Sequence, residues 1–129
     1  MNNPAQDSYQ LYIGGEWVDA SDGATLDSFC PATGEKLSTI ADATREDVDR
    51  AVEVAWKAFE TWGKTDKTER AAILNKVADI IEENAEKLAL LETLDNGKPI
   101  RETRAIDIAY SVDHFRYFAG VLLADTGEA

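Results

Sequence analysis

Apolar residues recur at steps of three and four along the last two thirds of the chain, the spacing of one face of an α-helix. The first such run is Val48, Val52, Ala55, Phe59 and Trp62. Thr44 and Asp47 at its start resemble a capping box, with Asp in place of the usual Glu, and Gly63 follows its end. The pattern therefore predicts a first helix over about 44–62.

A second run predicts a helix that begins near 65–68 and ends near Asn96. Its stripe is Leu74, Val77, Ile81, Leu88 and Leu91, widened by Ile73 and Ile80. At roughly 1.5 Å per residue this helix is over about 40 Å long. That length favours a scaffold element within a larger body.

A third run follows Pro99, a residue that favours the first position of a helix. Its stripe is Ile108, Val112, Phe115, Ala119 and Leu122. Tyr110, Tyr117 and Phe118 lie outside that stripe, so this helix is apolar on more than one side and needs several neighbours. We expect the second and third helices to form an antiparallel pair.

Short apolar segments separated by turn residues in the first 43 positions predict strands. Gly14-Gly15 lies between two apolar-aromatic runs and is typical of a two-residue hairpin turn. Two further extended segments flank a turn at 31–34. The expected fold class is α-rich α+β, with a small antiparallel β portion over 1–43 and a helical portion over 44–129.

The strongly negative net charge of the chain argues against two classes of binding partner, nucleic acids and membranes. The 129 residues include 13 Lys and Arg against 25 Asp and Glu, a formal net charge of −12. Such a surface repels phosphate backbones and anionic lipid, so we expect no nucleic-acid and no membrane partner. The start of the chain lacks the basic and apolar regions of a secretory signal. A single cysteine also fits a reducing compartment, so we expect a cytoplasmic protein.

Few residues offer candidate chemistry. The sequence contains no Gly-x-Gly-x-x-Gly turn, no phosphate-binding loop and no Gly-x-Ser-x-Gly elbow. We interpret Cys30, the only cysteine, as a small buried residue rather than a nucleophile. We interpret His114, the only histidine, as a solvated or capped helix residue rather than a general base.

Asp95 is the strongest candidate for a binding role. It falls in the last turn of the second predicted helix, where the helix dipole disfavours an acid, and the apolar stripe places it inward. A carboxylate in that position needs a cation. The residues alone leave two alternatives: a salt bridge to Lys98, Arg101 or Arg104, which they favour, and a hard metal ion held together with carbonyl oxygens.

Four stretches in this order resemble the amino-terminal region of NAD(P)-dependent aldehyde dehydrogenases. They are LYIGGEWVDA, FCPATGEKLSTIADATREDVDRAVEVAWKAFETW, TERAAILNKVADIIEENAEKLALLETLDNGKPIRET and DHFRYFAG. The resemblance extends from about Leu11 to Gly120. The short segments at 100–103 and 113–118 are most similar to those of the bacterial acetaldehyde dehydrogenase branch. The resemblance implies a fragment of an α/β enzyme, with all of 1–129 in the amino-terminal part of the cofactor-binding domain.

The family oxidises aldehydes to acids through a cysteine thiolate, with hydride transfer to NAD or NADP. The resemblance implies that the catalytic cysteine, the general-base glutamate, the oxyanion asparagine and the Gly-rich cofactor turn all lie downstream of this region. Catalytic residues, cofactor-binding residues and the oligomerisation part are therefore expected to be absent here. Cys30 matches a position before the Pro-x-Thr-Gly-Glu turn and is not the nucleophile. We expect no dehydrogenase activity and no bound NAD or NADP from this chain alone.

One functional position is implied by the resemblance. In many relatives the aspartate of Leu-Asp-Asn-Gly-Lys helps to hold a structural sodium or potassium ion, together with backbone carbonyls just before the Pro-x-Thr-Gly-Glu turn. Here those positions are Asp95 and the carbonyls of Phe29 and Cys30. A further carbonyl comes from downstream in relatives, so the site is expected to be partial. Lys98 or Arg101 is the fallback partner of Asp95.

Two hypotheses about partners follow. As part of an enzyme, the chain would bury its surplus apolar helix faces against the remainder of that enzyme or, without it, by self-association. The alternative is a stand-alone acidic helical binding module without enzymatic activity. Light scattering discriminates between them, since a module predicts a monomer with cooperative unfolding and a severed part predicts dimers or aggregates.

Overall fold

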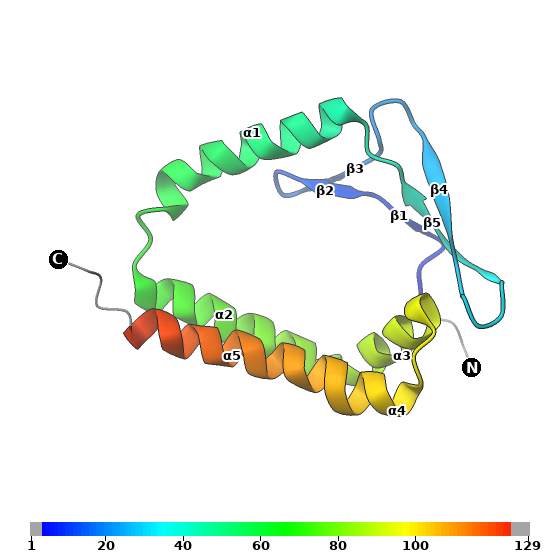
Figure 1. Cartoon of the computed structure of the whole chain (residues 1–129). Helices are drawn as coiled ribbons and strands as arrows, with labels where there is room; N and C mark the ends of the chain where they lie inside the picture. The colour runs from blue at the N-terminus through cyan, green and yellow to red at the C-terminus, as the bar shows by residue number, and fades with distance from the viewer. Residues whose placement is uncertain (1–3, 125–129) are drawn as a thin grey trace. The chain divides into compact units, whose positions relative to one another are not determined.

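The computed structural model describes residues 4–124, which form two compact units that meet in sequence between Lys64 and Thr65. Figure 1 labels the strands and α-helices of both units, and each unit is described by itself. The helical portion begins close to residue 44 as expected, but the first helix belongs to the same unit as the strands. The boundary between the two compact units, after Lys64, therefore lies beyond the first helix. It does not coincide with the change from strands to helices near residue 44.

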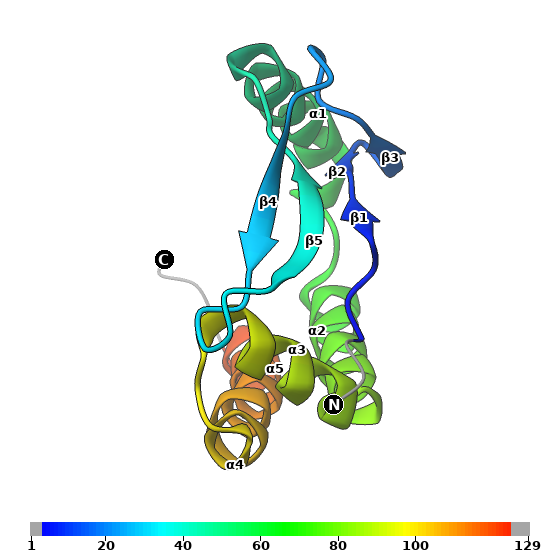
Figure 2. The same cartoon turned by 90° about the vertical axis from the view of Figure 1, so that its right-hand side faces the viewer.

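The first unit contains a three-stranded sheet in the order β1-β5-β4, formed by β1 (Ser8–Tyr9), β4 (Thr25–Phe29) and β5 (Lys36–Ala41). Figure 2 shows β4 and β1 along opposite edges of β5. The strands β4 and β5 pair antiparallel, whereas β1 and β5 pair parallel. The expectation of a purely antiparallel unit is therefore wrong. The chain reaches β5 from β1 through the intervening strands, so β1 can run alongside it in the same direction.

A separate two-stranded hairpin joins β2 (Leu11–Ile13) to β3 (Glu16–Val18) around Gly14-Gly15. Both glycines have positive φ, 66° and 90°, which a two-residue hairpin turn requires and which glycine adopts without a Cβ clash. The space at Gly14 is also restricted, because an added Cβ would lie 3.3 Å from Cγ1 of Val54. The hairpin thus lies against the following helix at Gly14.

That helix, α1 (Arg45–Trp62), begins with the capping box expected from the sequence. The Thr44 hydroxyl accepts from the Asp47 amide at 3.2 Å, and the Asp47 carboxylate accepts from the Thr44 amide at 3.1 Å. The same carboxylate accepts from the Ser21 amide at 2.9 Å. Asp47 therefore joins the loop before β4 to the start of α1.

The apolar stripe of α1 is exposed rather than covered by the first unit. Its large members are each about half exposed: Val48, Val52, Phe59 and Trp62. Trp56 beside them is 68% exposed. The face that contacts the hairpin instead includes Val54. The first unit alone therefore leaves its most apolar helix face uncovered.

In the second unit, the long second helix of the sequence prediction is two helices, α2 (Lys67–Glu83) and α3 (Ala85–Asn96). The prediction of one continuous helix is wrong because Asn84 interrupts it, with φ −107° and ψ 13°. The Asn84 side-chain amide donates to the Ile80 carbonyl at 2.8 Å, so a side chain replaces the regular backbone pattern there. The next helix restarts at once, because the Leu88 amide donates to the Asn84 carbonyl.

The third predicted helix starts one residue later than expected and changes its winding. Pro99 is the N-cap with extended ψ of 133°, and α4 (Ile100–Glu102) follows it. The chain then passes through a π-helical segment, η1 (Thr103–Ile108), into α5 (Ala109–Ala124). Thr103 at the start of η1 is fully buried. Its hydroxyl donates to the Ala89 carbonyl at 3.0 Å and so attaches η1 to α3.

The helices α2 and α5 pack along their lengths and run in opposite directions, as Figure 1 shows. The buried residues at this pair are small or medium in size: Ala71, Ala78, Val112 and Ala119. Arg116 on α5 contacts Asp79 at 3.2 Å and Glu82 at 2.6 Å on α2. Small interface residues allow close approach, and the ion pairs fix which residues lie level with one another. The core of the second unit lies at this pair and where η1 meets α3.

Candidate functional site

Asp95 lies in the last turn of α3, as the sequence predicted, but its side chain is exposed. Gly97 ends the helix in the left-handed conformation, with φ 81°, and its amide donates to the Thr93 carbonyl at 3.0 Å. The expectation that Asp95 points inward is wrong within the second unit. The break at Asn84 separates α3 from the α2 stripe, and the buried side of α3 is centred on Ala89.

The three cations considered as partners of Asp95 contact other carboxylates. Lys98 lies 2.7 Å from Asp107, and this carboxylate raises the pKa of the Lys98 ammonium. Arg104 contacts Glu86 at 2.6 Å, and Arg101 contacts Glu102 at 3.5 Å. The turn after α3 is therefore rich in ion pairs at the surface.

The second part of the predicted cation site is the turn that follows β4. The Cys30 amide donates to the Glu35 carbonyl at 2.9 Å, and the Cys30 carbonyl accepts from the Gly34 amide at 2.8 Å. Cys30 is only 3% exposed, which confirms the interpretation of a small buried residue. The Thr33 hydroxyl, followed by the Thr33 and Ala32 amides, donates to the sulfur and lowers the pKa of the Cys30 thiol.

The predicted cation site has its parts in both units, with Phe29 and Cys30 in the first and Asp95 in the second. Their convergence stays a prediction. Within residues 4–124, no three or more His, Cys, Asp or Glu side chains gather as a metal site would require. A site of the predicted kind uses one carboxylate and backbone carbonyls, which suits a monovalent ion rather than a transition metal.

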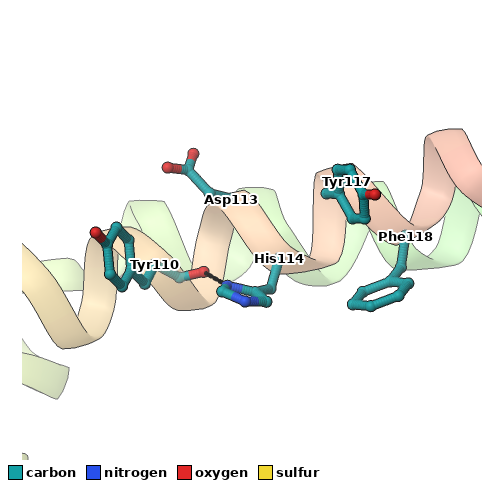
Figure 3. Close-up of a pocket in the computed structure, with 5 residues that line it drawn as sticks. All are labelled: Tyr110, Asp113, His114, Tyr117 and Phe118. Atoms are coloured by element: carbon teal, nitrogen blue, oxygen red, sulfur yellow. Dashed lines mark hydrogen bonds between the residues drawn. The ribbon is translucent and has the colours of Figure 1, made fainter.

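An apolar recess of about 380 Å³ lies on the exposed side of α5, where the surplus aromatic residues of the third predicted helix gather. Its lining residues are Tyr110, Asp113, His114, Tyr117 and Phe118. Figure 3 shows His114 and Phe118 pointing to the same side of the helix. His114 is exposed and its Nδ1 lies 2.7 Å from the Tyr110 carbonyl, as expected for a solvated or capped helix residue. Most of the surface of the recess is apolar and aromatic, so its lining suits apolar contact.

None of the helices among residues 4–124 is both long and apolar enough to cross a bilayer. One structural residue, Thr103 in η1, escaped the sequence analysis. It is a polar residue at a position that helical periodicity leaves unmarked. Asp47 was detected only as a cap, although the Ser21 amide also bonds to it.

The comparisons with known proteins agree over almost the whole chain. The family model described as "Aldehyde dehydrogenase family" matches residues 17–129. This chain belongs to the aldehyde dehydrogenase family. "Acetaldehyde dehydrogenase 2" of Cupriavidus necator is 46% identical over 127 residues, which cover 98% of this chain and 25% of that protein. "Aldehyde dehydrogenase B" of Escherichia coli is 47% identical over 119 residues, covering 92% and 23%.

Solved structures of aldehyde dehydrogenases show the same backbone. The G224D mutant of the Bacillus cereus aldehyde dehydrogenase superposes with a TM-score of 0.90 at 41% identity, covering 94% of this chain and 25% of that one. An NAD+ complex of the Bacillus cereus enzyme gives a TM-score of 0.85 at 43% identity, covering 88% and 23%. The chain thus spans about a quarter of the length of these aldehyde dehydrogenases and matches their amino-terminal portion.

Proposed function

We propose that this chain is the amino-terminal portion of an enzyme that oxidises an aldehyde to its carboxylic acid with NAD or NADP. The observation that supports the proposal is the identity of 46% across 98% of the chain to an enzyme named for acetaldehyde. A small aliphatic aldehyde such as acetaldehyde is therefore the first substrate to test. The bound NAD or NADP would supply the hydride acceptor, and the described residues would support its domain rather than contact it.

The contribution of this region would be mechanical. The α2–α5 pair and the attachment of η1 to α3 form a preorganised framework for a cofactor-binding domain. The nucleophile, the general base and the oxyanion donor would come from later parts of the polypeptide. On this basis the chain of 129 residues alone has no dehydrogenase activity.

The proposal is tested by a fusion enzyme, made of this 129-residue chain followed by the part of the Cupriavidus necator acetaldehyde dehydrogenase 2 that lies beyond the matching segment. We expect the fusion enzyme to reduce NAD in the presence of acetaldehyde, because its amino-terminal portion matches the segment it replaces. We expect the 129-residue chain to produce no NADH under the same conditions. The measurement is absorbance at the NADH band with and without aldehyde.

Two results would contradict the proposal. A fusion enzyme that is folded by circular dichroism yet inactive would show that this region cannot act as an aldehyde dehydrogenase portion. Aldehyde-dependent NADH production by the pure, sequence-verified short chain would overturn its expected inactivity. Replacing the catalytic cysteine of the fusion partner by alanine provides the control for background reduction.

We propose further that the exposed apolar stripe of α1 packs against the remainder of the enzyme. Val48, Val52 and Phe59 are each about half exposed, and burying them recovers about 25 cal/mol for each Å² of apolar surface. Without the remainder, the same faces favour self-association. Light scattering on the 129-residue chain should show dimers or larger species; a monomer that unfolds cooperatively would instead support the stand-alone binding module.

The partial cation site is also a proposal. Asp95 would bind sodium or potassium together with the Phe29 and Cys30 carbonyls and a carbonyl from the remainder of the enzyme. The Cys30 carbonyl already accepts one hydrogen bond from Gly34, and a carbonyl oxygen has a second lone pair for an ion.

Exchanging sodium and potassium for tetramethylammonium should leave the melting temperature of the 129-residue chain unchanged, because its site lacks one ligand. The same exchange should lower the melting temperature of the fusion enzyme, and Asp95→Asn should remove that sensitivity. A clear fall for the short chain would show that the partial site still binds. A fusion enzyme insensitive to the exchange would contradict the site altogether.

A further inference from the structure

Asn96 and Gly97 form the only Asn-Gly pair in the sequence, and both residues are exposed at the end of α3. An asparagine followed by glycine readily loses its side-chain amide, because glycine has no Cβ to obstruct attack by its own nitrogen. The other asparagines that the structure describes, Asn75 and Asn84, are followed by residues with side chains. The residue pair therefore singles out Asn96 as a candidate for covalent modification.

The reaction uses only the groups of these two residues and water. The Gly97 nitrogen forms a bond to Cγ of Asn96 and gives up its proton, while the side-chain nitrogen leaves as ammonia. Water then opens the resulting five-membered succinimide ring at one of its two carbonyl carbons. One opening gives aspartate, and the other gives isoaspartate, in which the main chain passes through the side-chain carbon. Neither product requires an oxidant, a metal ion or a cofactor.

Hydrogen bonds in the structure hold each of the polar groups that this reaction rearranges. The Gly97 amide donates to the Thr93 carbonyl at 3.0 Å, in the left-handed conformation that ends α3. The side-chain amide nitrogen of Asn96 donates to the Glu92 carboxylate, and its oxygen accepts from the Lys98 amide at 2.8 Å. The Gly97 nitrogen must leave its bond to Thr93 and turn toward Cγ of Asn96. Attack therefore requires the last turn of α3 to open.

We propose that Asn96 deamidates spontaneously in the folded chain, at a rate set by the opening of the last turn of α3. A helix end opens at a smaller free-energy cost than the whole domain, so the reaction proceeds slowly without global unfolding. The inference does not depend on the proposed function.

The products weaken the turn in which they form. Their carboxylate adds a charge beside Asp95 and one helical turn from Glu92, where the negative end of the helix dipole also disfavours an acid. Isoaspartate in addition lengthens the main chain immediately before the Gly97 cap. Modification therefore loosens the connection between α3 and α4.

The test follows the unsubstituted 129-residue chain during incubation at mildly alkaline pH, with peptide mapping by mass spectrometry. We expect Asn96 to change mass as an amide converted to an acid, with isoaspartate as the larger product, while Asn75 and Asn84 keep their amides. In guanidinium chloride sufficient to unfold the chain, the rate at Asn96 should rise by at least about tenfold, because the hydrogen bonds that hold the turn are absent.

Glu92→Ala removes the acceptor of the Asn96 side-chain amide. This substitution should raise the rate in the folded chain by about threefold and leave the rate in guanidinium chloride unchanged. Glu83→Ala is the matched control, because it removes the same charge from an exposed position at the end of α2. Asn96→Asp carries the charge of one product and should unfold at a lower temperature than the unsubstituted chain.

The proposal is overturned if Asn96 keeps its amide in the folded chain while it converts fully in guanidinium chloride, or if it converts in neither condition. Equal rates in the two conditions would contradict control of the reaction by α3, as would equal rates for Glu92→Ala and Glu83→Ala. Conversion of Asn75 or Asn84 as fast as Asn96 would show that the pair is not singled out. An Asn96→Asp chain as stable as the unsubstituted one would contradict the weakening of the turn.

Discussion

Replacement of Asp47 by alanine is expected to lower the melting temperature of the 129-residue chain by about 10 °C at pH 7. Asp47 is 2% exposed, and one of its oxygens accepts from the Ser21 amide at 2.9 Å and the Thr44 amide at 3.1 Å. Its other oxygen lies 3.2 Å from Nη2 of Arg50. Alanine removes every one of these acceptors, so the start of α1 and the loop before β4 lose their common attachment. Circular dichroism at 222 nm measures the transition.

Because Asp47 is charged, its contribution to the stability of the chain depends on pH. The Ser21 amide, opposed by desolvation and assisted by the Thr44 amide and hydroxyl, lowers the pKa of the Asp47 carboxyl below its ordinary value of 3.8. A carboxyl with a depressed pKa in the folded state stabilises that state above the unfolded pKa, and this contribution is lost as the pH falls through the folded pKa. The unsubstituted chain should therefore lose stability on acidification below about pH 4, to a greater extent than Asp47→Ala.

Asp47→Asn separates the charge from the hydrogen bonds. An asparagine oxygen can still accept from the Ser21 and Thr44 amides, so the fall at pH 7 should be smaller than for alanine, and the acid dependence should diminish. Asp49→Ala is the control on the same helix, since Asp49 is largely exposed and lies 3.9 Å from Arg45. A melting temperature for Asp47→Ala equal to that of Asp49→Ala would show that the buried carboxylate does not hold this loop.

The elements that could be predicted from the sequence are those specified by neighbouring residues. The capping box at Thr44 and Asp47 needs only three residues of spacing. The hairpin turn at Gly14-Gly15 needs two residues that accept positive φ. The stripe of the third helix was also correct in Val112 and Ala119, which are both buried. In each case the local pattern and the final packing agree.

The features that could not be predicted are those that the apolar pattern does not mark. The helical period continues through Asn84, although its backbone angles and the bond from its side chain to the Ile80 carbonyl end α2 there. An unbroken helix would place Asp95 on the same face as the apolar stripe of α2. Because the helix breaks at Asn84, Asp95 is exposed instead. The apolar stripe of α1 was predicted correctly. Its periodicity does not show, however, that the first unit leaves this face exposed. The proposed cation site has the same limit, since the residues proposed for it, Phe29, Cys30 and Asp95, belong to two separate units.

The π-helical segment could not be predicted either, because nothing in the helical periodicity of the sequence marks Thr103. The hydroxyl of this fully buried residue donates to the Ala89 carbonyl at 3.0 Å and lies 2.9 Å from the Thr93 hydroxyl. Ala89 itself is fully buried, so α3 and η1 approach closely at this point. A polar side chain thus occupies a buried position that the apolar pattern does not mark.

Thr103→Val keeps the shape of the side chain and removes its hydroxyl, and we expect it to lower the free energy of unfolding by about 2 kcal/mol. The loss comes from the bond to the Ala89 carbonyl and from the Thr93 hydroxyl, which is left without its partner. Chemical denaturation followed by circular dichroism gives the value from the midpoint and slope. Thr103→Ser is the matched control, because it retains the hydroxyl and loses only a methyl group, at a cost of about 1 kcal/mol.

A double-mutant cycle with Thr93→Val shows whether the two hydroxyls act together. If each bonds to the other, Thr93→Val should cost little once Thr103 is already valine, and the coupling free energy should be about 1 kcal/mol. Strict additivity would mean that the 2.9 Å contact contributes nothing to stability. If the Thr103→Val chain were as stable as the unsubstituted chain, the hydroxyl would not be needed at all. Apolar packing against Ala89 would then suffice to attach η1 to α3. The expected result instead makes one hydroxyl the contact that holds the π-helical segment, and therefore the start of α5, in its register.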